Sequence, residues 1–73
     1  MGQGAVFTKR EARQYLKVYG KQLRAKRKKL SLTQLEVAHI IGCSQAVISF
    51  IECGYMLPPA EIESELLELY EEE

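Results

Sequence analysis

Several patterns that would mark other classes of protein are missing from this 73-residue chain. Its two cysteines do not form a Cys-x-x-Cys pair and it has one histidine, so the ligand spacing of a zinc site is absent. No apolar run approaches the roughly 20 residues that a membrane span requires, and there is no secretory signal pattern. Nor is there a nucleophile beside its base, a phosphate-binding glycine loop or a poised pair of carboxylates. We therefore expect a cytoplasmic protein that is not an enzyme, with no metal, no cofactor and no membrane association.

Positive charge is absent from the whole second half of the chain. All ten Lys and Arg residues precede Leu30, whereas nine of the ten glutamates follow it and seven lie between Glu61 and Glu73. The net charge of zero therefore conceals a basic and an acidic end. One interpretation is a basic face for phosphates, with the acidic end kept away from DNA or holding a partner. The other is an acidic C-terminal helix lying beside a basic N-terminal one, and the two are compatible.

The segment from residue 33 to residue 54 carries the start and stop signals of two short helices. Thr33 and Glu36 form a capping box that begins the first, and Gly42 falls where a residue that tolerates positive φ ends it. Ser44 is a good N-cap for the second, and Gly54 ends it in the same way. The apolar residues expected to face inward are Val37, Ala38, Ile40 and Ile41 in the first helix, and Val47, Ile48 and Ile51 in the second. Two short helices joined at a glycine are typical of a helix-turn-helix.

From about Gly20 to Pro58 the chain resembles the Cro/C1-type repressor family, also called the XRE family. The resemblance implies an all-α fold: a small lambda-repressor-like bundle of four to five helices that contains the helix-turn-helix. Its matching positions are Leu23, Arg24, Arg27, Leu32, Thr33, Gln34, Val37, Ala38, Ile41, Gly42, Ser44, Gln45, Ile48, Ser49, Ile51, Glu52, Gly54 and Pro58.

The flanking regions complete the expected organisation. Residues 1–7 should form a flexible N-terminal segment, and residues 8–73 a single domain. Thr8 opens a second capping box with Glu11, followed by one long helix or two nearly collinear helices interrupted at Gly20. One face of this region carries Ala12, Tyr15, Leu16, Tyr19, Leu23, Arg27 and Leu30 at steps of three or four residues.

The two ends of the chain depart from the resembled family. Its first helix starts near Gly20, so the helical segment before Gly20 is additional here. Pro58 and Pro59 are expected to open a last helix, with proline at its first position and an apolar stripe of Ile62, Leu66, Leu69 and Tyr70. Members of the family normally continue into another helix. We expect the additional segment, with Tyr15, Leu16 and Tyr19, to cover the core surface that such a helix would cover. The alternative is that this surface stays open and is a dimer or partner interface.

The resemblance also implies a mode of action. The second helix of the pair, residues 45–53, would enter the major groove of double-stranded DNA while the first lies across the backbone. The expected base-reading residues are Gln45, Ala46, Ser49 and Phe50, with Gln45 suited to adenine. The expected phosphate contacts are Gln34, Ser44, Arg24, Lys26, Lys28 and Lys29. Arg27 and Glu52 are expected to form a structural salt bridge.

Two functions follow from these observations. The first is a sequence-specific transcriptional regulator, a repressor that binds DNA as a homodimer. The second is a protein-interaction module on the same fold, an antitoxin-like or antagonist subunit, because Phe50, Tyr55, Met56 and Leu57 form an aromatic and apolar group without a cation. For each proposed DNA contact the plain alternative is a solvated polar side chain or, for Ser44, a helix cap alone.

Overall fold

A computed structural model describes residues 8–71, and within them the fold is an all-helical bundle. The flexibility expected of residues 1–7 lies outside the described part. The four helices are α1 (Lys9–Lys29), α2 (Gln34–Ile41), α3 (Gln45–Glu52) and α4 (Ala60–Tyr70). The expectation of a small helical bundle that contains a helix-turn-helix is confirmed.

Each of the first three helices begins where its capping signal predicts. In the capping box of α2 the Glu36 N–H donates to Thr33 Oγ1 at 3.0 Å, and the Thr33 N–H donates to the Glu36 carboxylate at 2.8 Å. Thr8 and Glu11 make the same reciprocal pair at the start of α1. Ser44 accepts the Val47 N–H at the start of α3. These bonds satisfy backbone donors that a helix leaves open in its first turn.

Glycines end α2 and α3 in the left-handed conformation. Gly42 has φ 90° and Gly54 has φ 80°, a region that other residues enter only with strain. The chain bends by 118° between α2 and α3. Within residues 8–71 no single helix is both long and apolar enough to cross a membrane, and only α2 and α3 taken together, as this bent pair, meet those two criteria.

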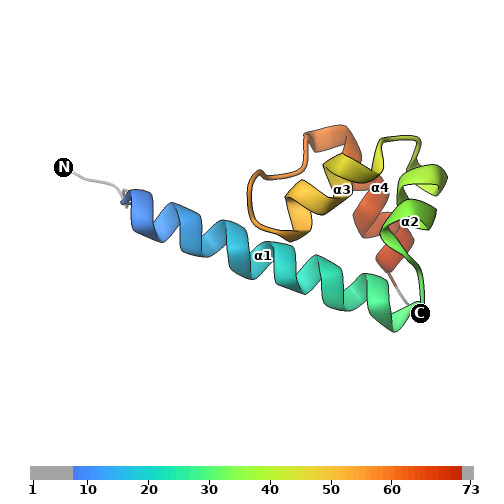
Figure 1. Cartoon of the computed structure of the whole chain (residues 1–73), viewed down its shortest axis with the longest axis horizontal. Helices are drawn as coiled ribbons and strands as arrows, with labels where there is room; N and C mark the ends of the chain where they lie inside the picture. The colour runs from blue at the N-terminus through green and yellow to red at the C-terminus, as the bar shows by residue number, and fades with distance from the viewer. Residues whose placement is uncertain (1–7, 72–73) are drawn as a thin grey trace.

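The core forms where all four helices meet. In Figure 1, α1 runs along the long axis of the molecule, and α2, α3 and α4 gather over its C-terminal half. Burial of one large aliphatic side chain stabilises such a core by roughly 1.5–3 kcal/mol. The buried apolar residues are Leu23, Val37, Ala38, Ile48, Ile51, Leu66 and Tyr70.

Gly20 lies at the closest crossing of α1 and α3 and does not interrupt α1. A Cβ atom at this position would stand 2.5 Å from the Ile51 carbonyl oxygen and 2.6 Å from that of Glu52. Glycine therefore lets the middle of α1 touch the backbone at the end of α3. Of the two alternatives for this region, one continuous helix is the observed one.

The first half of α1 does not cover the core as expected. Figure 1 shows its N-terminal turns extending beyond the other three helices. From Lys9 to Val18 only Leu16 is even half-buried, and Tyr15 is 52% exposed. Tyr19 is the first α1 side chain packed against the core. The expectation is right for Tyr19 but wrong for Tyr15 and Leu16, because the packing of the other helices against α1 begins at Tyr19.

Two smaller expectations also fail. Ile40 is exposed because α2 turns Val37, Ala38 and Ile41 inward and leaves Ile40 on its outer side. Pro59 is the N-cap of α4 and not its first helical residue, and it offers no capping side chain. The apolar stripe of α4 is confirmed, since Leu66 and Tyr70 are buried while Ile62 and Leu69 pack against the core.

A side-chain hydrogen bond ties α4 to the middle of α1. The Tyr19 hydroxyl donates to the Glu63 carboxylate across this junction. Burial and this bond raise the pKa of Tyr19 to about 12. The bond therefore joins the basic helix to the acidic one by a neutral donor.

Candidate nucleic-acid interface

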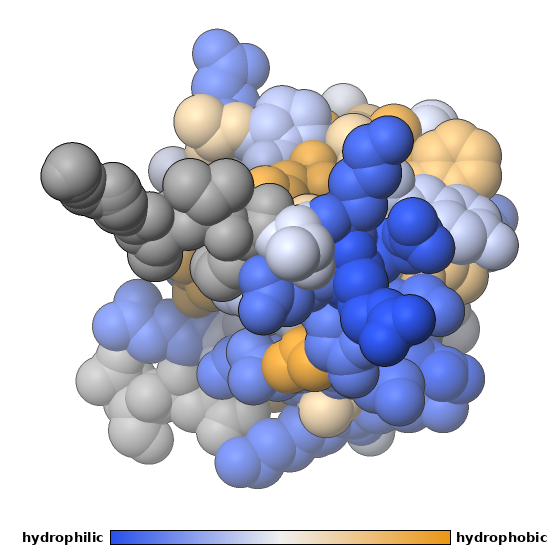
Figure 2. Space-filling model, turned by 90° about the vertical axis from the view of Figure 1, so that its left-hand side faces the viewer, coloured by the Kyte–Doolittle hydropathy of each residue, from blue (hydrophilic) through white to orange (hydrophobic). Residues whose placement is uncertain are grey.

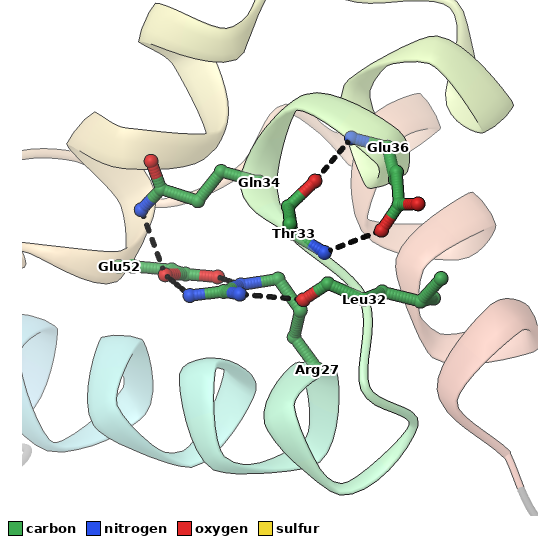
Figure 3. Close-up of polar contacts among 6 residues, drawn as sticks. All are labelled: Arg27, Leu32, Thr33, Gln34, Glu36 and Glu52. Carbon is green, nitrogen blue, oxygen red and sulfur yellow. Dashed lines mark hydrogen bonds and ion pairs between the residues drawn. The ribbon is translucent and has the colours of Figure 1, made fainter.

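A buried ion pair joins α1 to the end of α3 (Figure 3). The Arg27 guanidinium donates from Nε to Glu52 Oε2 at 2.7 Å and from Nη2 to Glu52 Oε1 at 3.0 Å. Only 8% of the Arg27 side chain and 3% of the Glu52 side chain are exposed. The two parallel bonds set the orientation as well as the distance between the helices. This is the ion pair that the sequence led us to expect.

The same pair extends to the loop before α2 and to α2 itself. Arg27 Nη1 donates to the Leu32 carbonyl at 2.7 Å, and Gln34 Nε2 donates to Glu52 Oε1 at 3.0 Å (Figure 3). The hydrogen bond to Glu52 raises the pKa of Arg27 further above its ordinary value. One network therefore holds α1, the N-terminus of α2 and the end of α3 in fixed relation. The Leu32 and Gln34 contacts have no signal in the sequence.

Gln34, expected to contact phosphate with its side chain and its backbone N–H, also belongs to this network. One N–H of its side-chain amide is bonded to Glu52, which leaves the second amide N–H, the side-chain carbonyl oxygen and the backbone N–H at the first position of α2. The N–H groups at a helix N-terminus favour an anion. A phosphate contact by the Gln34 backbone N–H is compatible with the observed geometry, and so is one by the second side-chain N–H, since the bond to Glu52 uses only one of the two.

A hollow of about 500 Å³ lies where α1, α2 and α3 converge. Arg24 from α1, Gln34 from α2 and Gln45 from α3 all line it. Three residues expected to contact DNA thus border one depression. Cys53, the C-cap of α3, also lines the hollow and was not singled out for this site from the sequence.

The outward side of α3 carries the other expected base-reading residues. Gln45, Ala46 and Phe50 are exposed and Ser49 is half-buried. Ser44 has its hydroxyl engaged as the N-cap. The first turn of α3 is therefore open to a ligand, with an amide and a methyl group at its tip.

The expected phosphate-binding cations do not lie together. Arg24 lines the hollow beside Gln45, and Lys28 is exposed. Lys26 and Lys29 border a different depression on the side of α4, together with Tyr70 and Glu71. The four cations therefore face different sides of the molecule, because successive residues at the end of a helix point to different sides, and their phosphate contacts stay a prediction.

The aromatic and apolar group at the end of α3 is smaller than expected. Phe50 and Tyr55 lie with their ring centroids 6.1 Å apart, and Leu57 is also exposed. Met56 is half-buried and packs against the core, so it does not belong to the exposed group. What remains is a patch of two rings and one leucine, which we call the Phe50 patch.

Comparison with known proteins agrees with this geometry. No curated protein matches the chain. A family model described as helix-turn-helix matches residues 23–72, which include the end of α1 and all of α2, α3 and α4. The turns of α1 that extend past the bundle lie outside the match. The family consists of DNA-binding regulatory domains and is not a family of enzymes. The chain belongs to the helix-turn-helix family, of the Cro/C1 (XRE) type.

Proposed function

We propose that the protein is a transcriptional regulator, acting as a repressor, that binds a specific double-stranded DNA sequence as a homodimer. The observation that carries this proposal is the hollow that Arg24, Gln34 and Gln45 share beside the open first turn of α3. An amide at the tip of an exposed helix suits the edge of a base, and a guanidinium and a helix N-terminus suit phosphates.

Within this proposal the residues have separate roles. Gln45, with Ala46, Ser49 and Phe50, reads bases in the major groove, and Gln45 pairs with adenine. Arg24, Lys28 and the N-terminus of α2 hold the backbone. The Arg27–Glu52 pair touches no DNA and positions α3 against α2. The homodimer follows from the small footprint of one helix, since two copies reading half-sites one helical turn apart double the contacts.

Selection of sequences from a random pool of duplexes tests the proposal. The wild-type chain is expected to enrich a two-fold symmetric site with half-sites about 10 base pairs apart. Gln45→Ala should lose about 1–3 kcal/mol of discrimination at one position in each half-site while affinity for other sequences stays the same. Lys26→Gln, on the α4 side, is the matched control and should enrich the wild-type site. A pool that yields no motif with the wild-type chain contradicts the proposal.

The Phe50 patch favours a second function, a protein-interaction module of the antitoxin-like or antagonist kind. Two rings and a leucine without a cation are a composition found at protein interfaces. Phe50→Ala in the same selection separates the two functions. Loss of preference at a thymine in the motif assigns Phe50 to base reading through the thymine methyl. An unchanged motif, together with loss of a protein partner captured by the wild-type chain, assigns the patch to the partner.

A further inference from the structure

Six cations form a continuous stripe along one side of α1. At about 100° of rotation per residue, positions 10, 13, 17, 21, 24 and 28 fall within an arc of about 80°. Their spacings alternate between three and four residues, the repeat that keeps side chains on one face of a helix. The members of this stripe are Arg10, Arg13, Lys17, Lys21, Arg24 and Lys28, and all six are exposed.

The stripe faces the same side of the molecule as the hollow. Arg24 is one of the residues that line the hollow with Gln45. Seven residues earlier, Lys17 packs against the loop that follows α3, since a Cβ atom on Gly54 would lie 2.8 Å from Lys17 Cα. The stripe therefore begins at the candidate interface, runs past the end of α3 and continues beyond the bundle.

No acidic group neutralises the stripe within the described residues. The single glutamate of α1, Glu11, lies about 100° away from Arg10 around the helix and caps the Thr8 N–H. None of the six cations forms an ion pair in residues 8–71. Figure 2 views the molecule from the end where α1 begins, and strongly hydrophilic side chains dominate the surface nearest the viewer.

The location of the first cations is unfavourable for the helix itself. Arg10 lies in the first turn of α1, where the partial positive charge of the helix end repels a cation. Neither Arg10 nor Arg13 supports the core, because the first turns of α1 extend beyond it. The two residues therefore do not stabilise the fold, and their exposed charges are available to a negatively charged partner.

We propose that the part of α1 that extends beyond the bundle is a second DNA-backbone contact, in which Arg10, Arg13, Lys17 and Lys21 bind phosphates flanking the sequence read by α3. This proposal rests on the proposed function and lengthens its footprint. These four residues span 11 residue steps, or about 17 Å, which matches about five base pairs of duplex at 3.4 Å each. They supply the phosphate neutralisation that Lys26 and Lys29, on the α4 side, do not.

Salt titration of two matched variants on the selected duplex tests the proposal. Arg10→Gln/Arg13→Gln removes two stripe cations, and Lys26→Gln/Lys29→Gln removes the same charge from the other side of α1. Each phosphate contact contributes about 0.9 to the slope of log affinity against log salt. The stripe variant should therefore flatten the slope by about 2 for each protomer, or nearly 4 for the proposed homodimer, and weaken binding at low salt by at least on the order of 10-fold. The control variant, Lys26→Gln/Lys29→Gln, should change the slope and the affinity at low salt by less than half as much.

Duplex length gives an independent readout. The wild-type chain should gain affinity when about five flanking base pairs are added to each side of the selected site, and the stripe variant should not. Both variants should enrich the same motif, because the stripe reads no bases. Equal slopes for the two variants, or no gain from flanks with the wild-type chain, overturns the proposal.

The possible outcomes distinguish failure of the flanking contact from failure of the proposed function on which it rests. If the wild-type chain selects no sequence, the proposed function fails and the stripe has no duplex to flank. If selection succeeds and depends on Gln45 while the stripe variant titrates like the control, the flanking contact alone fails. If the stripe variant instead lowers self-association in sedimentation and leaves the slope unchanged, the stripe binds the acidic α4 of a second copy, and the flanking contact is likewise overturned.

Discussion

The two halves of α1 are both helical and rich in cations but have opposite surroundings. From Tyr19 to Lys29 the helix contributes Gly20, Leu23 and Arg27 to the buried interior, while from Lys9 to Val18 it buries nothing fully. The comparison shows that local signals decide that a helix forms, whereas contacts with α3 and α4 decide which part of it supports the fold. The half that extends beyond the bundle is left free to act as a surface.

The largest expected difference between the halves is in the loss of stability when one arginine in each is replaced by glutamine. Arg27→Gln leaves the Glu52 carboxylate buried without its counter-charge, a change that typically costs about 3–5 kcal/mol. Arg13→Gln removes an exposed charge and should stay within about 0.5 kcal/mol. Urea unfolding followed by circular dichroism measures both. The expected shift for Arg27→Gln is a large fraction of a total stability of about 5–15 kcal/mol.

A double replacement makes this result more specific. Arg27→Met/Glu52→Leu removes both charges and should recover much of the loss, because desolvation offsets most of the attraction in a buried pair. Equal instability of the single and double variants would contradict a role that lies mainly in orientation. The same role would be contradicted if the Arg27→Gln protein proved as stable as the Arg13→Gln protein.

The buried arginine also illustrates how far sequence reasoning reaches. Capping boxes at Thr8 and Thr33 and the cap at Ser44 are local, so the starts of three helices could be predicted from spacing alone. The pairing of Arg27 with Glu52 came from the family resemblance. Its further bonds to Leu32 and Gln34 depend on how the loop before α2 folds back, and no sequence pattern encodes that.

The main wrong prediction concerned how far along α1 the buried core extends. The reason lies in the tertiary contacts of α1 and not in its own sequence. The apolar face of α1 continues from Leu23 back to Tyr15 and Ala12 without a break, so periodicity predicted burial along its whole length. Burial stops near Tyr19 because Gly20 sets the point at which α3 crosses. A glycine in a helix can mark an interruption or a close contact, and only the partner helix distinguishes the two.

The crossing of α1 and α3 at Gly20 gives a second test of how the two halves of α1 differ. Gly20→Ala places a methyl carbon 2.5 Å from the Ile51 carbonyl oxygen, so α1 and α3 must move apart. Overpacking of this kind costs about 1–3 kcal/mol, even though alanine favours a helix over glycine by about 1 kcal/mol. Gln14→Ala, in the half that extends beyond the bundle, is the control and should be neutral or slightly stabilising. A stabilised Gly20→Ala protein would show that the crossing tolerates more space than the geometry indicates.

The smallest effect is expected at the junction of the two halves, where Tyr19 bonds Glu63. Tyr19→Phe removes one half-buried hydrogen bond, and such bonds contribute about 0.5–1.5 kcal/mol. The sign of the pH dependence follows from the pKa, which rises from 10.0 to about 12 in the folded chain. The neutral hydroxyl is favoured by folding, so its contribution is complete below pH 10 and disappears as the pH approaches 12. Melting temperatures between pH 8 and pH 12 are the measurement.

The control for this junction is an exposed tyrosine elsewhere in the molecule. Tyr55→Phe changes a ring that is 71% exposed, and it should leave both the melting temperature and its alkaline decline unchanged. Tyr19→Phe should melt lower at pH 8 and decline less between pH 10 and pH 12, because Tyr70, whose burial also raises its pKa to about 12, still contributes a decline in the variant. Parallel curves for Tyr19→Phe and the wild-type chain would mean that the last contact between α1 and α4 is held by packing alone, and that the boundary between the halves depends on Gly20.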